Sequence, residues 1–418
     1  MQNYIPRLIE TSISRELSAI GCVSIEGPKW CGKSTTAELF AKTVIKLQNP
    51  IIFTQYSAFA STSKENLLRG EKPILFDEWQ KIPEIWDFIR TDIDETRLIG
   101  QYLLTGSSKP SKAQSRHTGT GRIAKLTMYP MSLWESSDSV GSVSLYDLFY
   151  SSHAVLGQSK ITLDEIAFVI CRGGWPQAVL RPDQALILSQ DYFNSLTTED
   201  ISDVDDIKRN PRRAREILRS YARNICSFAS TSTLLSDVAS NDSTMDIKTL
   251  TSYIIAFEKL FVIDNIAAWT PALRSKSVIR AANKRQFIDP SIAAAALGAK
   301  PNDLINDLKT FGFFFESLCH RDLKIYANSM GGELYHYHDS YGLEIDGIIH
   351  LSDGKWGAVE IKLGGNEIEQ AANNLLCLKN RVNSNLGDPS FLMVLTGAPY
   401  AYKRTDGVIV VPIGCLKN

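Results

Sequence analysis

The stretch that most constrains the fold of this 418-residue chain is "GPKWCGKST", residues 27–35. It fits the pattern Gly-x-x-x-x-Gly-Lys-Ser/Thr, and it lies between an apolar segment, "GCVSIEG", and a segment with helical spacing, "KSTTAELFAKTVIKL". A strand, a glycine-rich turn and a helix in this order form a loop whose backbone N–H groups surround phosphate oxygens. The motif therefore predicts nucleotide binding within an α/β fold.

The loop positions have roles that follow from their chemistry. Gly27 and Gly32 allow backbone torsions that direct N–H groups at phosphates. The Lys33 ammonium would neutralise the β and γ phosphates of ATP, and the Ser34 hydroxyl would be a ligand of Mg²⁺. The other residues expected to contact the nucleotide are Pro28, Lys29, Trp30, Cys31 and Thr35.

Two acids end the next apolar segment, "KPILFDE". Ligands of open α/β sheets bind at the carboxyl ends of the strands, so Asp77 and Glu78 are expected beside the loop. Asp77 would hold Mg²⁺ through water, and Glu78 would polarise the attacking water. The two acids could also simply cap a solvated strand end, but the neighbouring loop favours hydrolysis of the nucleotide.

Hydroxyl groups end the following segment, "QYLLTGSS". Thr105, Ser107 and Ser108 are candidates to sense the γ-phosphate, although a turn whose hydroxyls bond the backbone would use the same residues. Arg122 precedes another expected strand, "IAKLTMYP". It could neutralise transition-state charge at a neighbouring subunit's nucleotide, which would require a homo-oligomer, or it could be an ordinary surface arginine.

The spacing of apolar residues divides the chain into parts. Strands alternating with helices predict a parallel, three-layer α/β domain near the N-terminus. The middle is mostly helical, and "STLLSDVAS" followed by "MDIKTLTSYIIAFEKLFVIDNIAAW" predicts a winged helix-turn-helix. Period-2 segments such as "LEIDGIIHL" and "WGAVEIKLG" predict strands near the C-terminus. The predicted domains are residues 1–135 (ATPase core), 136–200 (helical lid), 201–295 (winged helix) and 296–418 (terminal domain).

Charge and cysteine usage exclude several classes. The formal net charge is -1, so nucleic acid would need a local basic surface, such as the seven Lys/Arg of residues 208–223, which could also be a solvated helix face. The cysteines form no C-x-x-C pair, which argues against a zinc site or a disulfide framework and for a reducing compartment. There is no apolar run of about 20 residues and no signal-peptide pattern, which predicts a cytoplasmic protein without a membrane partner.

A second set of charged residues lies near the C-terminus. In a strand, Glu360 and Lys362 of "AVEIKLGG" would share one face and Ile361 would take the other, and Asp346 lies on the preceding strand. An acid followed by Glu-x-Lys on the next strand matches the PD-(D/E)xK nuclease pattern. Asp346 and Glu360 would hold Mg²⁺ with the Ile361 carbonyl, and Lys362 would stabilise developing charge. A cross-strand ion pair explains the same charges, so cleavage of nucleic acid stays open.

The chain resembles the AAA+ superfamily, specifically prokaryotic ATPases that end in a domain of unknown function with a nuclease-like fold. The resemblance covers nearly the whole length. It implies an α/β fold with a P-loop AAA+ core, a helical lid, a winged helix and a terminal α/β domain like that of restriction endonucleases. It rests on "GPKWCGKST", "ILFDEWQKIPEIWDFIR", "LLTGSS", "GRIAKLTMYPMSLWE", "RGGWPQAV", "DYFNSLTTEDI", "EIDGI" and "VEIKLG".

The same resemblance implies four further site residues. The "GGWP" segment looks like the element with which related signalling ATPases contact adenine, which makes Gly174 and Pro176 candidates. Relatives with the nuclease-like fold often place one more carboxylate at the position of Glu316, and they also use the position of Gln370.

These observations predict a protein that binds and hydrolyses ATP with Mg²⁺. Its nucleotide state would control a DNA-linked or signalling activity of the C-terminal half, with DNA or another nucleic acid contacting the winged helix and the terminal domain. Two alternatives remain. The first is a Mg²⁺-dependent nuclease regulated by ATP, and the second is a non-catalytic ATP switch that recruits a protein partner.

Overall fold

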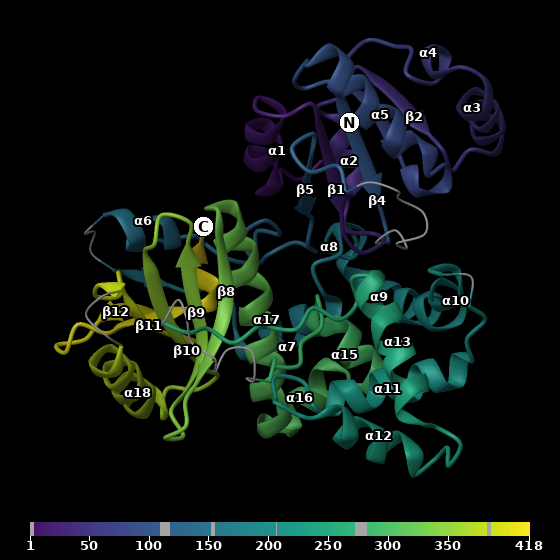
Figure 1. Cartoon of the computed structure of the whole chain (residues 1–418). Coiled ribbons are helices and arrows are strands. Elements are labelled where there is room, and N and C mark those ends of the chain that lie inside the picture. The colour runs from purple at the N-terminus through teal and green to yellow at the C-terminus, as the bar shows by residue number, and fades with distance from the viewer. Residues whose placement is uncertain (1–3, 109–117, 152–154, 206, 272–281, 383–385) are drawn as a thin grey trace.

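A computed structural model describes residues 4–108, 118–151, 155–205, 207–271, 282–382 and 386–418. Figure 1 shows an N-terminal α/β region at the upper right, a helical region below it, and a second sheet with its helices at the lower left. None of the helices in these ranges combines the length and the hydropathy that crossing a bilayer requires.

The N-terminal region is built on a five-stranded sheet in the order β2-β3-β4-β1-β5, and all four pairings are parallel. This confirms the predicted parallel α/β core. Strands β1, β3 and β4 are buried along their whole length, whereas only the first residue of the edge strand β5, Ile123, is buried. The strands are β1 (Cys22–Glu26), β2 (Thr43–Lys46), β3 (Ile74–Asp77), β4 (Tyr102–Gly106) and β5 (Ile123–Thr127). The helices are α1 (Ile9–Leu17), α2 (Lys33–Glu38), α3 (Pro50–Thr62), α4 (Lys64–Leu67), the 3₁₀ helix η1 (Trp79–Lys81) and α5 (Glu84–Thr96).

The helix expected over residues 33–47 is shorter than predicted, since α2 ends at Glu38. Residues Thr43–Lys46 form strand β2 instead, which pairs in parallel with β3. Its β-branched residues suit a strand. Pairing with β3 supplies the backbone N–H and C=O groups with the hydrogen-bond partners that they would otherwise find within a longer helix. The helical spacing of the segment was therefore misleading.

The helical region follows, and its helices begin at recognisable caps. The Asn210, Ser230 and Asp246 side chains accept hydrogen bonds from the first turns of α11, α12 and α13. After α13 the chain forms two antiparallel bridges, Ile263–Phe287 and Ile266–Lys284. A short helix is thus followed by a longer helix and two isolated bridges, and the winged helix-turn-helix stays a prediction. The helices are α6 (Leu145–Tyr150), α7 (Leu163–Arg172), α8 (Pro176–Leu180), η2 (Pro182–Gln184), α9 (Ala185–Ser195), the π-helical η3 (Leu196–Asp200), α10 (Ile201–Asp203), α11 (Pro211–Arg223), α12 (Thr231–Ala239), α13 (Ile247–Lys259), α15 (Pro290–Leu297) and α16 (Pro301–Asn306).

The second sheet has seven strands in the order β7-β12-β13-β11-β10-β9-β8. Helices α17 and α18 cover opposite faces, since α17 packs in one apolar cluster with Val359 and Ile361, and α18 packs in another with Ala358 and Ile348. The elements are α17 (Leu308–Ser329), β8 (Gly332–His338), β9 (Glu344–Leu351), β10 (Trp356–Lys362), α18 (Ile368–Arg381), β11 (Leu392–Thr396), β12 (Tyr400–Lys403), β13 (Ile409–Pro412) and η5 (Ile413–Cys415).

Two short strands from the middle of the chain pair with the C-terminal part. Strand β7 (Gly157–Gln158) pairs antiparallel with β12, and β6 (Val143–Ser144) pairs in parallel with β14 (Leu416–Lys417). The sequence had grouped these residues with the lid. One apolar cluster also continues from α7 through α11 and α17 into the second sheet, so the helical region and the terminal part share a core.

Candidate functional site

The glycine-rich loop lies between β1 and α2 and approaches its neighbours closely. A Cβ atom on Gly27 would lie 2.2 Å from the Met128 carbonyl oxygen, so no larger residue fits there. Gly32 has φ 99, a left-handed backbone conformation that favours glycine. Trp30 also has a positive φ, of 70, which is uncommon for a bulky residue and marks a constrained backbone in the loop.

Lys33 points into the loop and is buried there. Its Nζ donates to the carbonyl oxygens of Gly27, at 3.0 Å, and Pro28, at 2.7 Å. An ammonium group has three donors and carries its charge at one point, so it can exchange carbonyl partners for phosphate oxygens without a change of rotamer class. The structure therefore holds this lysine at the position the motif predicts.

Asp77 lies at the carboxyl end of β3 and joins three elements. Its Oδ1 accepts hydrogen bonds from the Ser34 hydroxyl at 2.6 Å and from the Thr105 hydroxyl at 2.6 Å. The carboxylate is almost completely buried. Because strands β3 and β4 are parallel neighbours, their ends bring Asp77 and Thr105 together, as the sequence implied.

Glu78 follows directly and is oriented by its surroundings. Its backbone has φ 59 and ψ 48, a left-handed conformation that is uncommon for residues other than glycine. Its backbone N–H donates to the Thr105 hydroxyl at 3.2 Å. Its Oε2 accepts from the Ser107 hydroxyl at 2.8 Å and from the Gln80 amide. The side chain thus has fixed partners beside the loop, and the role of Gln80 was not foreseen from the sequence.

Lys33, Ser34, Glu78 and Ser107 line one cavity of about 870 Å³, within the usual range for a small-ligand site. Asp77 and Thr105 do not line it but are buried directly behind Ser34. The far wall comes from α8, α10 and the end of α13, so the cavity lies between the parallel sheet and the helical region. An ion pair of 2.5 Å between Lys29 and Asp200 spans the two walls. The predicted site residues that line the cavity are Lys29, Trp30, Gly32, Lys33, Ser34, Thr35, Glu78, Ser107, Ser108 and Pro176.

The predicted adenine-contacting segment is brought to the cavity in part. Pro176 lines it and lies 3.6 Å from where a Gly32 Cβ would be. Gly174 instead packs against the chain that leaves β5, since its carbonyl accepts from the Met131 N–H at 2.6 Å and its N–H donates to Asp289. Gly174 therefore positions the segment, and Pro176 faces the cavity.

The donor set at the sheet edge fits a magnesium ion. Mg²⁺ prefers hard oxygen ligands and keeps several waters, and the Ser34 hydroxyl and Asp77 carboxylate lie within hydrogen-bond distance of each other at the cavity. Cys31, by contrast, is buried and offers its backbone: its carbonyl oxygen accepts from the Arg7 guanidinium at 2.6 Å.

Two arginines have contacts that differ from what the sequence predicted. Arg122 precedes β5 at the amino end of the sheet, opposite the loop, and pairs with Asp94 of its own domain at 2.6 Å. The structure does not bring it to this chain's own cavity. Arg7, which the sequence did not single out, is buried and bridges Cys31, Tyr129 and Glu135. No local pattern marks it, because its partners are distant in sequence.

The second group of charged residues assembles at β9 and β10. Glu360 and Lys362 share a face, with 2.9 Å between Nζ and Oε2, and Ile361 packs on the other side, as expected. Asp346 accepts from the Ile361 N–H at 2.9 Å and lies 3.4 Å from the Lys362 ammonium. The α18 partner of Glu360 is Asn374, at 3.1 Å. Gln370 on the same helix is exposed.

Glu316 on α17 joins this group through a lysine that the sequence did not identify. The Lys284 ammonium lies 2.7 Å from Glu316, 3.0 Å from Glu344 and 3.3 Å from Asp346. The imidazole of His320, one helical turn after Glu316, is hydrogen-bonded to the Asp346 carbonyl oxygen at 2.9 Å. Three carboxylates thus converge on a single ammonium group.

Burial dominates the protonation of this cluster. Burial raises the pKa of Glu316 to about 7 and of Glu360 to about 8, against the opposing pull of the nearby lysines. Burial would also raise the pKa of Asp346, but Lys284 and Lys362 outweigh it and hold that pKa below its ordinary value. Burial lowers the pKa of His320 to about 3, so this imidazole is neutral.

The terminal cluster does not fit a magnesium ion in this arrangement. One oxygen each of Glu316 and Asp346, two expected ligands, already accepts a hydrogen bond from Lys284. The other Asp346 oxygen accepts from the Ile361 N–H and the Lys362 ammonium. A divalent cation would need the same oxygens at about 2.1 Å, and it could not share them with an ammonium group. The residues named by the PD-(D/E)xK pattern are therefore assembled, but around a lysine.

The basic stretch of residues 208–223 is largely paired within the protein. Four of its arginines form ion pairs with carboxylates: Arg209 with Asp205, Arg212 with Glu216, Arg213 with Asp242 and Arg223 with Asp237. Arg215 donates to the Thr197 hydroxyl. Less of this charge faces solvent freely than the sequence suggested, which weakens the case for a strong phosphate-binding face.

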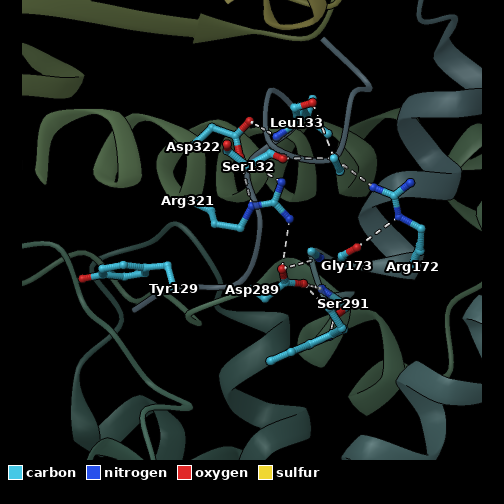
Figure 2. Close-up of polar contacts among 12 residues, drawn as sticks. Tyr129, Ser132, Leu133, Arg172, Gly173, Asp289, Ser291, Arg321 and Asp322 are labelled. Carbon is cyan, nitrogen blue, oxygen red and sulfur yellow. Dashed lines mark hydrogen bonds and ion pairs between the residues drawn. The ribbon is translucent and has the colours of Figure 1, made fainter. Parts of the chain in front are cut away.

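A buried polar network connects the cavity wall to α17, as Figure 2 shows. Arg321 donates to Asp289 at 2.9 Å and to Asp322 at 2.8 Å, and all three side chains are at most 1% exposed. Asp289 in turn accepts from the Gly174 N–H at 2.9 Å, and Asp322 accepts from the Leu133 N–H at 2.9 Å. The network therefore ties the segment that carries Pro176 to the helix that carries Glu316.

Comparison with protein families divides the chain into three matches. Residues 21–137 match the model described as "AAA domain". Residues 163–303 and 311–416 match two models described as domains of unknown function, DUF8612 and DUF4143. No curated protein matches the chain.

The solved structures that match include the Walker-type ATPase PABY2304 of Pyrococcus abyssi. It has 14% identity and a TM-score of 0.43, and the match covers 70% of this chain and 96% of that one. Two variants of the RuvB protein of Thermotoga maritima are 16% identical, with TM-scores of 0.29 and 0.28, and each comparison covers 61% of this chain and 88% of the other. The match to the AAA domain spans the glycine-rich loop, the carboxyl ends of β3 and β4, and the parallel sheet described above. The chain therefore carries an AAA-type P-loop ATPase domain.

Proposed function

We propose that this protein binds ATP with Mg²⁺ in the cavity between the parallel sheet and helices α8, α10 and α13, and hydrolyses it. The observation that carries the proposal is that Ser34, Glu78 and Ser107 line the same cavity as Lys33, with Asp77 and Thr105 hydrogen-bonded behind them. Phosphoryl transfer needs little covalent chemistry from the protein. It needs positioning and charge stabilisation, which this group can supply.

The residues divide the work as follows. Lys33 exchanges the Gly27 and Pro28 carbonyls for phosphate oxygens when the nucleotide enters. Ser34 and Asp77 hold Mg²⁺, whose charge offsets that of the phosphates. Thr105 fixes the Asp77 carboxylate in place.

Glu78 is the proposed general base. Its carboxylate is held by Ser107 and Gln80 at the cavity, where it can orient a water molecule and take its proton. If Glu78 gave up its hydrogen bond from Ser107 when the γ-phosphate is bound, its position would report on that phosphate. The hydroxyls at the end of β4 would then have the sensing role suggested by the sequence.

Glu78→Gln should retain ATP binding and slow hydrolysis by about 100-fold or more, because the amide cannot accept the proton. The measurement is release of inorganic phosphate under saturating ATP, together with ATP affinity by calorimetry. Glu84→Gln is the matched control, since Glu84 is an exposed glutamate in the same domain. Equal phosphate release from both variants would contradict the assignment of Glu78. No phosphate release from the wild type would favour a non-catalytic ATP switch.

We also propose that the nucleotide state reaches the C-terminal half through the Gly174–Pro176 segment and the Arg321 network. In this scheme residues 1–135 and 136–200 hold the nucleotide, and Asp203, Val204 and Leu260 complete the wall of its cavity. Residues 201–295 act as a winged helix that contacts DNA or another nucleic acid, and residues 296–418 engage it or a protein partner. The exposed position of Arg122, far from its own cavity, is compatible with action on a neighbouring copy in a homo-oligomer. The test is ATP turnover with and without DNA or RNA, and stimulation by one of them would identify the ligand.

A further inference from the structure

Lys284 is unusual because its charge is completely buried. Its side chain is 1% exposed, and its ammonium makes the three carboxylate contacts described above, with Glu316, Glu344 and Asp346. A buried lysine survives in a protein only when such partners compensate the lost hydration. The contacts come from α17 and β9, two elements of the terminal part, whereas Lys284 belongs to the segment that follows α13.

The backbone holds Lys284 at this point. Its N–H and carbonyl exchange hydrogen bonds with Ile266, at 2.9 and 3.0 Å, and the next residue, Arg285, donates its N–H to the Ser227 carbonyl at 2.8 Å. On the other side the Ala282 carbonyl bonds the His336 ring at 3.0 Å. Lys284 thus lies at an isolated β-bridge with Ile266, and hydrogen bonds of the neighbouring residues hold it in position.

The ammonium contacts two of the carboxylates that the PD-(D/E)xK pattern names as metal ligands. The carboxylates of Glu316 and Asp346 are two of the expected ligands, and the third, Glu360, is paired with Lys362. The cluster therefore pairs two lysines with four acids, which are Glu316, Glu344, Asp346 and Glu360. A divalent cation entering beside Lys284 would meet a like charge in a buried environment. The oxygens nearest to that position, Oε1 of Glu316 and Oδ1 of Asp346, already accept from the ammonium.

We propose that Lys284 is a tethered internal cation that takes the place of a divalent metal in the terminal cluster. The cluster then excludes Mg²⁺ and Mn²⁺ and does not cut nucleic acid. Its charges instead fasten the segment after α13 to α17 and β9. This inference does not rest on ATP hydrolysis, because none of these residues lines the nucleotide cavity.

The test is a titration of the full-length, nucleotide-free protein with Mn²⁺ alone, in which free Mn²⁺ is counted by electron paramagnetic resonance. Lys284→Met should gain one Mn²⁺ site that the wild type lacks, because the freed oxygens can then take a hard cation. Adding Asp346→Asn to Lys284→Met should remove this site again. Lys284→Arg, which keeps the charge, should gain none.

Two outcomes would overturn the proposal. A Lys284→Met protein that melts as a folded chain and binds no more Mn²⁺ than the wild type would show that the lysine masks no site. Should Lys284→Met not fold, the wild type decides alone: Mn²⁺ binding, or Mn²⁺-dependent cleavage of DNA or RNA, that disappears in Asp346→Asn would refute exclusion. Equal Mn²⁺ binding by the wild type and Asp346→Asn, with no cleavage, would support it. Phosphate release from ATP, measured in parallel, reports on the proposed function separately.

Discussion

Replacing Lys33 by alanine should lower the affinity for ATP by about 30-fold or more. The lysine is buried in the glycine-rich loop, and its ammonium is the charge nearest the loop carbonyls that the phosphates would displace. Removing one partner of a desolvated, hydrogen-bonded charge pair costs about 2–5 kcal/mol, and each 1.4 kcal/mol changes a dissociation constant about tenfold. Isothermal titration with ATP and Mg²⁺ measures the effect directly.

Lys42→Ala is the matched control, because Lys42 is an exposed lysine of the same domain and should leave ATP affinity unchanged. A melting curve of each variant without nucleotide separates a loss of binding from a loss of folding. If Lys33→Ala bound ATP as tightly as the wild type, the glycine-rich loop would not be the phosphate site. The whole scheme for hydrolysis would then have to be abandoned.

Replacing Arg321 by methionine should lower the free energy of unfolding by about 3–5 kcal/mol. The substitution keeps most of the side-chain volume, but it leaves Asp289 and Asp322 buried without their cation. An uncompensated buried charge lowers the free energy of unfolding by far more than the intact ion pair raised it. Urea unfolding of the full chain, followed by tryptophan fluorescence, measures the shift of the midpoint.

Two comparisons isolate the cause. Arg381→Met removes an arginine–aspartate pair of 2.6 Å on the surface of the same region, and its midpoint should move much less because solvent screens that pair. Adding Asp289→Asn and Asp322→Asn to Arg321→Met should recover part of the lost stability, since the orphaned charges are then gone. A failure to recover any would mean that the guanidinium acts through packing rather than through charge.

The sequence predicted the nucleotide site well because its residues lie in local patterns. The loop is a contiguous motif, and Asp77 and Thr105 each end an apolar strand, so a parallel sheet brings them to one edge whatever the rest of the chain does. Strand β2 was missed because residues 43–46 also fit a helical spacing, and only pairing with β3 decides between the two.

The terminal cluster shows where sequence reasoning stops. Asp346, Glu360 and Lys362 follow from strand alternation, and the structure brings them together. Lys284 does not follow, because it lies 32 residues before Glu316 and 62 before Asp346, in a segment with no periodic pattern. The same holds for Arg7 and Arg321, whose roles depend on tertiary contacts alone. A buried lysine is visible only once the fold around it is known.

The pairing of β6 with β14 and of β7 with β12 limits how this molecule can be divided. A fragment starting at residue 296 would lack both partners, and the exposed rims of β12 and β14 would be open to association with other chains. The polypeptide passes from the nucleotide-binding part to the far sheet, returns to build the helical region, and then completes the sheet that it had already visited. Movement during an ATP cycle must therefore preserve the pairing of β6 with β14 and of β7 with β12. The nucleotide-binding part and the C-terminal part can shift relative to each other only as far as the segment that carries β6 and β7 allows.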